Sequence, residues 1–147
     1  MRNYYMQIQQ YSEMLIQQIL LMDKKGIKNN GDTLSLTEIL ILKALGDQQE
    51  KKMADLIEEL NLDRNIFGTF INRLQSQNYV IKRRAKEDKR AQVLLLTDKG
   101  KLSFEQILLT EKELLLSLLN DFTFNEEKAI LKFLVKLDML RRNNHTP

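Results

Sequence analysis

The segment spanning residues 79–100 constrains the fold of this chain most strongly. It begins with six β-prone residues, YVIKRR, passes through a charged tip, AKEDKR, and returns as an apolar stretch, AQVLLL. The next residue, Thr97, has a side chain typical of a helix N-cap. This order predicts a β-hairpin that carries cations at its tip and leads directly into a helix.

Positive charge is concentrated around this hairpin. Residues 64–101 contain ten Lys and Arg against three Asp and Glu, a net charge of +7, whereas the whole chain carries only +3. The flanking regions, residues 1–63 and 102–147, carry net charges of −3 and −1. A cationic block between mildly acidic flanks predicts a surface for a polyanion, most simply nucleic acid.

The composition excludes several kinds of site. There is no cysteine, so disulfides, thiolate metal sites and thiol-oxidation sensing are excluded. The one histidine, His145, lies in a polar tail, so a zinc site would have to rely on carboxylates alone, and we expect no metal and no cofactor. No apolar run approaches the roughly 18 residues that cross a bilayer, so we expect a cytoplasmic protein without membrane contact.

The chain is expected to be mainly α-helical and to form a single domain over residues 1–147, because it has only one proline and five glycines and enough apolar residues for one core. Helix-start signals divide it clearly. We expect helices from Tyr4 to about Lys25, from Ser35 to Leu45, from about Lys51 to Leu60, from Asp63 to about Gln77, after Thr97 and after Thr123, with a loop over residues 27–33. We expect Asn78 to adopt the left-handed conformation that ends the fourth of these helices.

The helices over residues 51–60 and 64–77 have the spacing of a helix-turn-helix. The second has apolar residues at helical spacing on one face, and the opposite face is polar and lacks acidic side chains. Such a face is usually just solvated, so the prediction depends on the cationic hairpin that follows. The polar face consists of Arg64, Asn65, Gly68, Thr69 and Asn72.

The first and the last two helices carry more apolar surface than a single chain of this length can bury. Leucines in the helix after Thr97 extend nearly all the way round it, and the first helix has a near-heptad apolar stripe beginning at Tyr4. A second subunit is the natural source of the missing contacts. We therefore predict that these helices form a homodimer.

The most specific motif is Asp88-Lys-Arg90-Ala91, followed after a strand by Leu96-Thr97-Asp-Lys-Gly100. This pattern resembles the wing of the MarR family of bacterial transcription regulators, and the order of helices resembles that family over essentially the whole chain. The resemblance implies a mainly α fold with a small β-hairpin: a winged helix-turn-helix over about residues 35–100, and dimerisation helices over about residues 1–26 and 98–142.

The resemblance also implies how the chain binds DNA. The helix from Arg64 would enter the major groove, while Arg90 would enter the adjacent minor groove, its direction fixed by pairing with Asp88. Lys82 and Arg84 would contact phosphates. The interface implied for double-stranded DNA consists of Arg64, Asn65, Gly68, Thr69, Asn72, Arg73, Lys82, Arg84, Lys86, Asp88, Lys89 and Arg90.

The function implied is that of a homodimeric, sequence-specific regulator, a repressor of genes behind pseudo-palindromic operators, released by a small aromatic ligand. Two alternatives remain open: a helical dimeric interaction protein without sequence-specific DNA binding, and an enzyme. The enzyme has little support, because the chain lacks a phosphate-binding glycine loop and its paired carboxylates lie on exposed helix faces. Side chains that could line a ligand pocket, or form ordinary core, are Tyr4, Tyr5, Tyr11, Met14 and Phe104.

Overall fold

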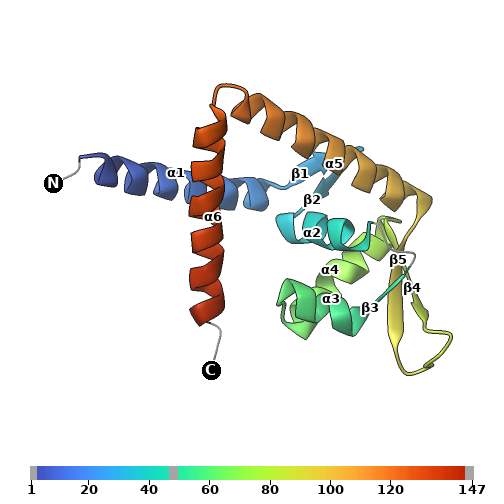
Figure 1. Ribbon diagram of the computed structural model, residues 1–147. Helices are drawn as coiled ribbons and strands as arrows, with labels where there is room; N and C mark the ends of the chain where they lie inside the picture. Colours follow the sequence, from blue (N-terminus) through green and yellow to red (C-terminus); the bar gives the residue numbers. More distant parts are fainter. Residues whose placement is uncertain (1–2, 47–49, 145–147) are drawn as a thin grey trace. The chain divides into compact units, whose positions relative to one another are not determined.

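The computed structural model describes residues 3–46 and 50–144 and is mostly helical (Figure 1). The described chain divides into two compact units, Met1–Gln106 and Ile107–Pro147. One folding domain over residues 1–147 stays a prediction, as does any role for His145, which lies outside the described residues. The elements are α1 (Tyr4–Lys25), β1 (Ile27–Asn29), β2 (Asp32–Leu34), α2 (Leu36–Leu45), β3 (Lys51–Lys52), α3 (Met53–Leu60), α4 (Arg64–Ser76), β4 (Val80–Arg84), β5 (Gln92–Leu96), α5 (Asp98–Leu119) and α6 (Phe124–Asn144).

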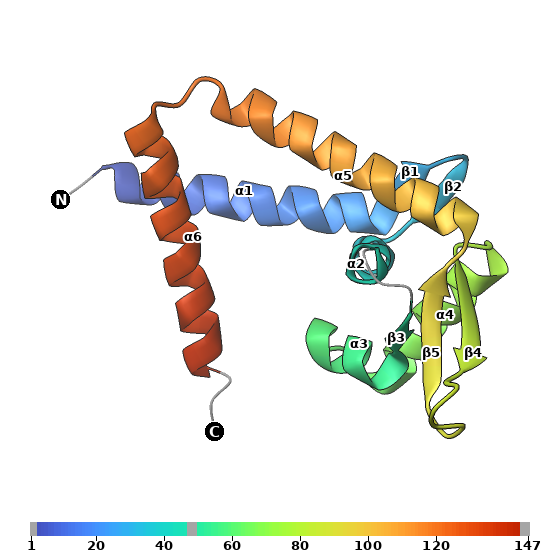
Figure 2. The ribbon, with the colours of Figure 1, turned by 45° about the vertical axis from the view of Figure 1, so that its right-hand side comes forward.

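The first unit contains the winged helix-turn-helix. Its sheet has the strand order β3-β5-β4 with antiparallel pairing throughout, and β5 lies in the middle, so that both Val93 and Leu94 are buried. Strands β4 and β5 extend side by side to a tip beyond α3 and α4, as both views show (Figures 1 and 2). The core beneath the sheet is formed by Leu34, Ile41, Leu42, Leu45, Leu56, Phe67, Ile71, Leu74, Tyr79, Val80, Val93, Leu94 and Leu96.

The helix boundaries follow from local hydrogen bonds that the sequence signalled. The capping box at α2 is complete, because the Ser35 hydroxyl accepts from the Glu38 amide and the Glu38 carboxylate accepts from the Ser35 amide. The Asp63 carboxylate likewise accepts from the second and third amides of α4. After α4, Asn78 has a φ of 67°, the left-handed conformation predicted where the chain turns into the wing.

Two predicted element boundaries were wrong. Residues 27–34 form a hairpin of β1 and β2 rather than a loop, because the turn residues Asn30 and Gly31 both have positive φ, as a tight two-residue hairpin turn requires. Lys51 and Lys52 begin no helix. They form the short strand β3 against β5, so a tertiary pairing overrides their local helix preference.

The terminal helices carry large apolar surfaces that the chain leaves uncovered. Helix α1 has no buried residue, and none of residues 107–144 in the second unit is buried. The Thr123–Glu126 capping box starts α6 as predicted. On α1 the exposed side chains include Tyr11 and Leu15, and in the second unit they include Leu115, Phe133 and Leu134.

Candidate nucleic-acid interface

Helix α4 is anchored by one face and leaves the other free. Phe67, Ile71 and Leu74 are buried, at the spacing of one helical stripe. Asn65 and Asn72 lie on the opposite side and are exposed. The helix is therefore held rigidly while its amide side chains remain available for hydrogen bonds to base edges.

Two small residues, Gly68 and Thr69, lie on the polar face of α4. Thr69 is exposed, and its hydroxyl donates to the Asn65 carbonyl at 3.2 Å. Gly68 has no atom within 4 Å of the position that a Cβ would occupy. None of the residues that the structure describes would therefore collide with a side chain at this position.

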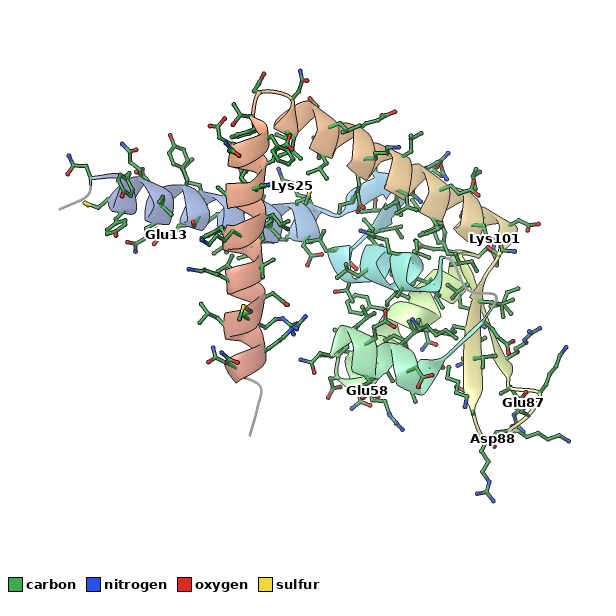
Figure 3. The ribbon with its side chains drawn as sticks, viewed as in Figure 1. Glu13, Lys25, Glu58, Glu87, Asp88 and Lys101 are labelled. Carbon is green, nitrogen blue, oxygen red and sulfur yellow. The ribbon has the colours of Figure 1, made fainter. Side chains whose placement is uncertain are left out.

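The wing tip holds Asp88 and Arg90 by a contact that differs from the predicted one. The Asp88 carboxylate accepts from the backbone amide of Arg90 at 3.0 Å, and its carbonyl accepts from the Ala91 amide at 3.0 Å. Asp88 therefore orders the turn through the backbone and leaves the Arg90 guanidinium without an acidic partner among the described residues. Figure 3 shows Glu87 and Asp88 at the tip, where Lys86 and Lys89 are exposed as well.

The strand cations divide into paired and unpaired groups. Arg83 pairs with Glu50 at 2.5 Å, and Lys51 pairs with Glu59. Arg84 is exposed and Lys82 is half-buried. These are the two strand residues that we predicted to contact phosphates. Pairing thus neutralises some cations of the wing base and leaves others with their full charge.

The Arg73 side chain forms hydrogen bonds within the protein. Its guanidinium donates to the Glu38 carboxylate at 2.9 Å and to the Thr33 carbonyl at 2.6 Å. Glu38 is completely buried, and its second carboxylate oxygen has no hydrogen-bond partner among the described residues. These contacts make Arg73 a positioning residue that fixes α4 against α2 and β2. Direct contact of Arg73 with DNA stays a prediction.

A second polar cluster fixes the end of α4. The Tyr79 hydroxyl donates to Asp32 at 2.6 Å, and Lys99 donates to Asp32 and to the Gln77 carbonyl, both at 2.8 Å. The Lys99 and Tyr79 hydrogen bonds lower the pKa of Asp32, and the bond to Asp32 raises that of Lys99. Burial, followed by the bond to Asp32, raises the pKa of Tyr79. The β1–β2 hairpin is thereby linked to both α4 and α5.

Sequence reasoning missed Lys52. It lies beside Arg64 and Arg90 around a hollow of about 290 Å³ between the start of α3, the start of α4 and the wing. Arg64, the first residue of α4, and Arg90 of the wing therefore line the same hollow. The adjacent lysines of β3 were the only available signal, and their assignment to a helix concealed it.

The residues predicted for a ligand pocket differ in their surroundings. Tyr4, Tyr5, Tyr11 and Met14 are exposed on α1, whereas Phe104 is buried and lies over Gly46. A pocket formed by all five stays a prediction. Within residues 3–46 and 50–144, no three His, Cys, Asp or Glu side chains gather as a metal site would require, and no helix is long and apolar enough to span a bilayer.

Comparison with known proteins places this geometry in a family. Residues 23–107 match the family described as transcriptional regulator SarA/Rot. The chain belongs to the SarA/Rot family. A curated relative, the HTH-type transcriptional regulator SarZ of Staphylococcus epidermidis, is 27% identical over 96 residues, which cover 65% of this chain and 62% of SarZ. The match therefore spans less than two thirds of that relative.

Solved structures confirm the MarR-like winged-helix fold. FabT of Streptococcus pneumoniae, solved in complex with DNA, superposes with a TM-score of 0.82 at 18% identity, covering 95% of this chain and 98% of FabT. MarR superposes with a TM-score of 0.62 at 21% identity, covering 77% of this chain and 78% of MarR. The predicted fold class is confirmed. At these identities the likeness concerns the fold alone.

Proposed function

We propose that this protein is a homodimeric regulator that binds double-stranded DNA sequence-specifically, and that it acts as a cytoplasmic repressor rather than an enzyme. The observation that carries the proposal is α4: a helix anchored by Phe67, Ile71 and Leu74 that presents exposed polar side chains next to a cationic wing. FabT, which has this fold, was solved with DNA bound.

The interface with DNA would comprise two kinds of contact. The face of α4 containing Asn65, Thr69 and Asn72 would contact base edges, because amide and hydroxyl groups match their donors and acceptors. Lys82, Arg84, Lys86 and Lys89 would contact phosphates, and Arg90 would enter the minor groove, where a narrow groove concentrates negative potential. Asp88 supports this last contact by ordering the backbone of Arg90.

Dimerisation would involve the terminal helices. Many of their apolar side chains are exposed among the described residues, and a two-fold dimer would bury them while presenting two α4 helices to successive half-sites about one helical turn apart. Binding of a small aromatic ligand against α1 would then alter the spacing of the two α4 helices. This ligand response is tested by adding phenolic acids to a preformed complex.

The experiment for the proposal selects duplexes from a random pool with the intact protein and measures its mass by sedimentation at micromolar concentration. We expect a dimer and enrichment of pseudo-palindromes. We also expect the logarithm of the binding constant to fall with the logarithm of salt concentration, by a slope of about −0.9 for each phosphate contacted. A monomer that enriches no duplex would contradict the proposal. A dimer that enriches none would favour the interaction protein instead.

A further inference from the structure

The hollow between α3, α4 and the wing is lined by three cations that have no acidic partner among the described residues: Lys52, Arg64 and Arg90. Neighbouring cations of the same lobe are neutralised, since Lys51 pairs with Glu59 and Arg83 pairs with Glu50. Unpaired cations therefore line this hollow as well as the wing. Cations that line one hollow repel one another less when an anion lies between them.

The position of Arg64 in its helix also indicates that an anion binds at this hollow. It is the first residue of α4, where the positive end of the helix dipole disfavours a cation. The Asp63 cap lies before it, but that carboxylate accepts from the amides of Asn65 and Ile66. A cation at this unfavourable position is best explained by an anion from outside the chain.

The proposed function identifies this anion. If α4 occupies a major groove and the wing tip the adjacent minor groove, the DNA strand that separates the two grooves must pass between these elements. The hollow lies there, between the first turn of α4 and Arg90. Every position on that strand presents a phosphate, so the contact needs no particular base.

We propose that Lys52 and Arg64 together bind one phosphate of the DNA strand that separates the two grooves, beside the place where Arg90 enters the minor groove. This inference rests on the proposed function and adds a contact from β3, an element outside the helix-turn-helix and the wing. Because β3 pairs with β5 of the wing, one phosphate bound by Lys52 and Arg64 fixes α4 and the wing in a common register on the duplex. Lys52 then contributes affinity and leaves sequence preference unchanged.

The chain offers a matched control for the test. Lys51 and Lys52 are adjacent on β3, but only Lys51 has an acidic partner. The test uses a duplex that the parent protein has enriched from the random pool. Binding of this duplex by the parent, by Lys52→Gln and by Lys51→Gln is measured over a range of salt concentrations. We expect Lys52→Gln to weaken binding about tenfold and to reduce the steepness of the salt dependence by at most about 0.9, the contribution of one phosphate, because Arg64 still contacts the same phosphate. Lys51→Gln should keep the parent's salt dependence.

Further variants separate the phosphate contact from folding and from base recognition. Lys52→Arg retains the charge and should bind like the parent, and Lys52→Gln should melt like the parent because its side chain is exposed. The ratio of affinities for enriched and scrambled duplexes should stay constant in Lys52→Gln. Replacing single phosphates by uncharged methylphosphonates should reveal one position whose replacement weakens the parent more than it weakens Lys52→Gln.

The outcomes distinguish the inference from the proposed function. If the parent binds its duplex and Lys52→Gln shows the same salt dependence, the phosphate site is overturned. The proposed function as a DNA-binding regulator would still stand. Loss of sequence preference in Lys52→Gln would also overturn the phosphate site, because the side chain would then contact a base. A parent that binds no duplex at all would contradict the proposed function itself.

Discussion

Replacing Arg73 by methionine tests whether this residue positions α4 or contacts DNA. The substitution keeps an unbranched side chain of similar length and removes the guanidinium. It thereby removes the hydrogen bonds to the Glu38 carboxylate and to the Thr33 carbonyl, at 2.9 and 2.6 Å. The fully buried Glu38 carboxylate is left with the Ser35 amide as its partner among the described residues.

The expected cost follows from the burial of the two partners. Removing one partner of a fully buried ion pair costs about 3–5 kcal/mol. Glu38 is fully buried, but the Arg73 side chain is 46% exposed, so solvent screens part of the interaction and the cost falls to about 2–3 kcal/mol. For a chain of this size, about 2–3 kcal/mol lowers the melting temperature by roughly 4–12 °C.

The assay measures melting temperature at fixed protein concentration in the parent and in a Glu38→Gln background. Glutamine can still accept from the Ser35 amide but carries no charge, so Arg73→Met should cost less than half as much there. DNA binding by folded Arg73→Met should weaken without a change in salt dependence. Equal costs in both backgrounds, or a melting temperature equal to the parent's, would refute the buried ion pair, and a shallower salt dependence would place Arg73 on a phosphate.

Three further predictions concern the wing, α4 and pH. Arg90→Ala should weaken duplex binding by about 1–3 kcal/mol with an unchanged melting temperature, and Asp88→Ala should weaken it less, since only backbone ordering is lost; binding titrations on both variants check this. Gly68→Ala should stabilise the protein by about 0.5–1 kcal/mol, and reduced affinity for the enriched duplex would then show that DNA lies close to this position. Because the folded-state pKa of Asp32 lies below its ordinary 3.8, its contribution to stability is present above that pH and lost as pH falls through the lowered value. Melting temperature should therefore fall more steeply with acidification in the parent than in Asp32→Asn, and parallel profiles would contradict the assigned hydrogen bonds to Lys99 and Tyr79.

The features that the sequence predicted well depend on local chemistry. Capping at Ser35 and Asp63 and the left-handed conformation of Asn78 each involve residues a few positions apart. A short segment of the sequence is therefore enough to predict them. The wing was predictable for a related reason, since two β-prone stretches flank a charged tip and a cap. Its strands, Val80–Arg84 and Gln92–Leu96, lie within one residue of the predicted ones.

The features that the sequence did not predict depend on contacts between distant residues. Lys51 and Lys52 become a strand only because β5 lies beside them. Arg73 acquires its partners from residues 35 and 40 positions earlier, so nothing near it in the chain distinguishes it from a DNA-binding arginine. Asp88 shows the reverse: its proximity to Arg90 was clear, but the choice between a side-chain ion pair and a backbone hydrogen bond depends on the geometry of the turn.

The unpredicted β1–β2 hairpin links α1 to α4. Only Gly26 separates α1 from β1, and a side chain there would collide with Thr33, so the junction is tightly packed. Adjacent residues of β2 then bind the far half of α4 and its exit: the Thr33 carbonyl accepts from Arg73, and the Asp32 carboxylate accepts from Tyr79 and Lys99. In a dimer formed through α1, these contacts rather than the loop expected from sequence would set the distance between the two α4 helices. The same polar contacts that stabilise the lobe would therefore determine which half-site spacing the dimer accepts.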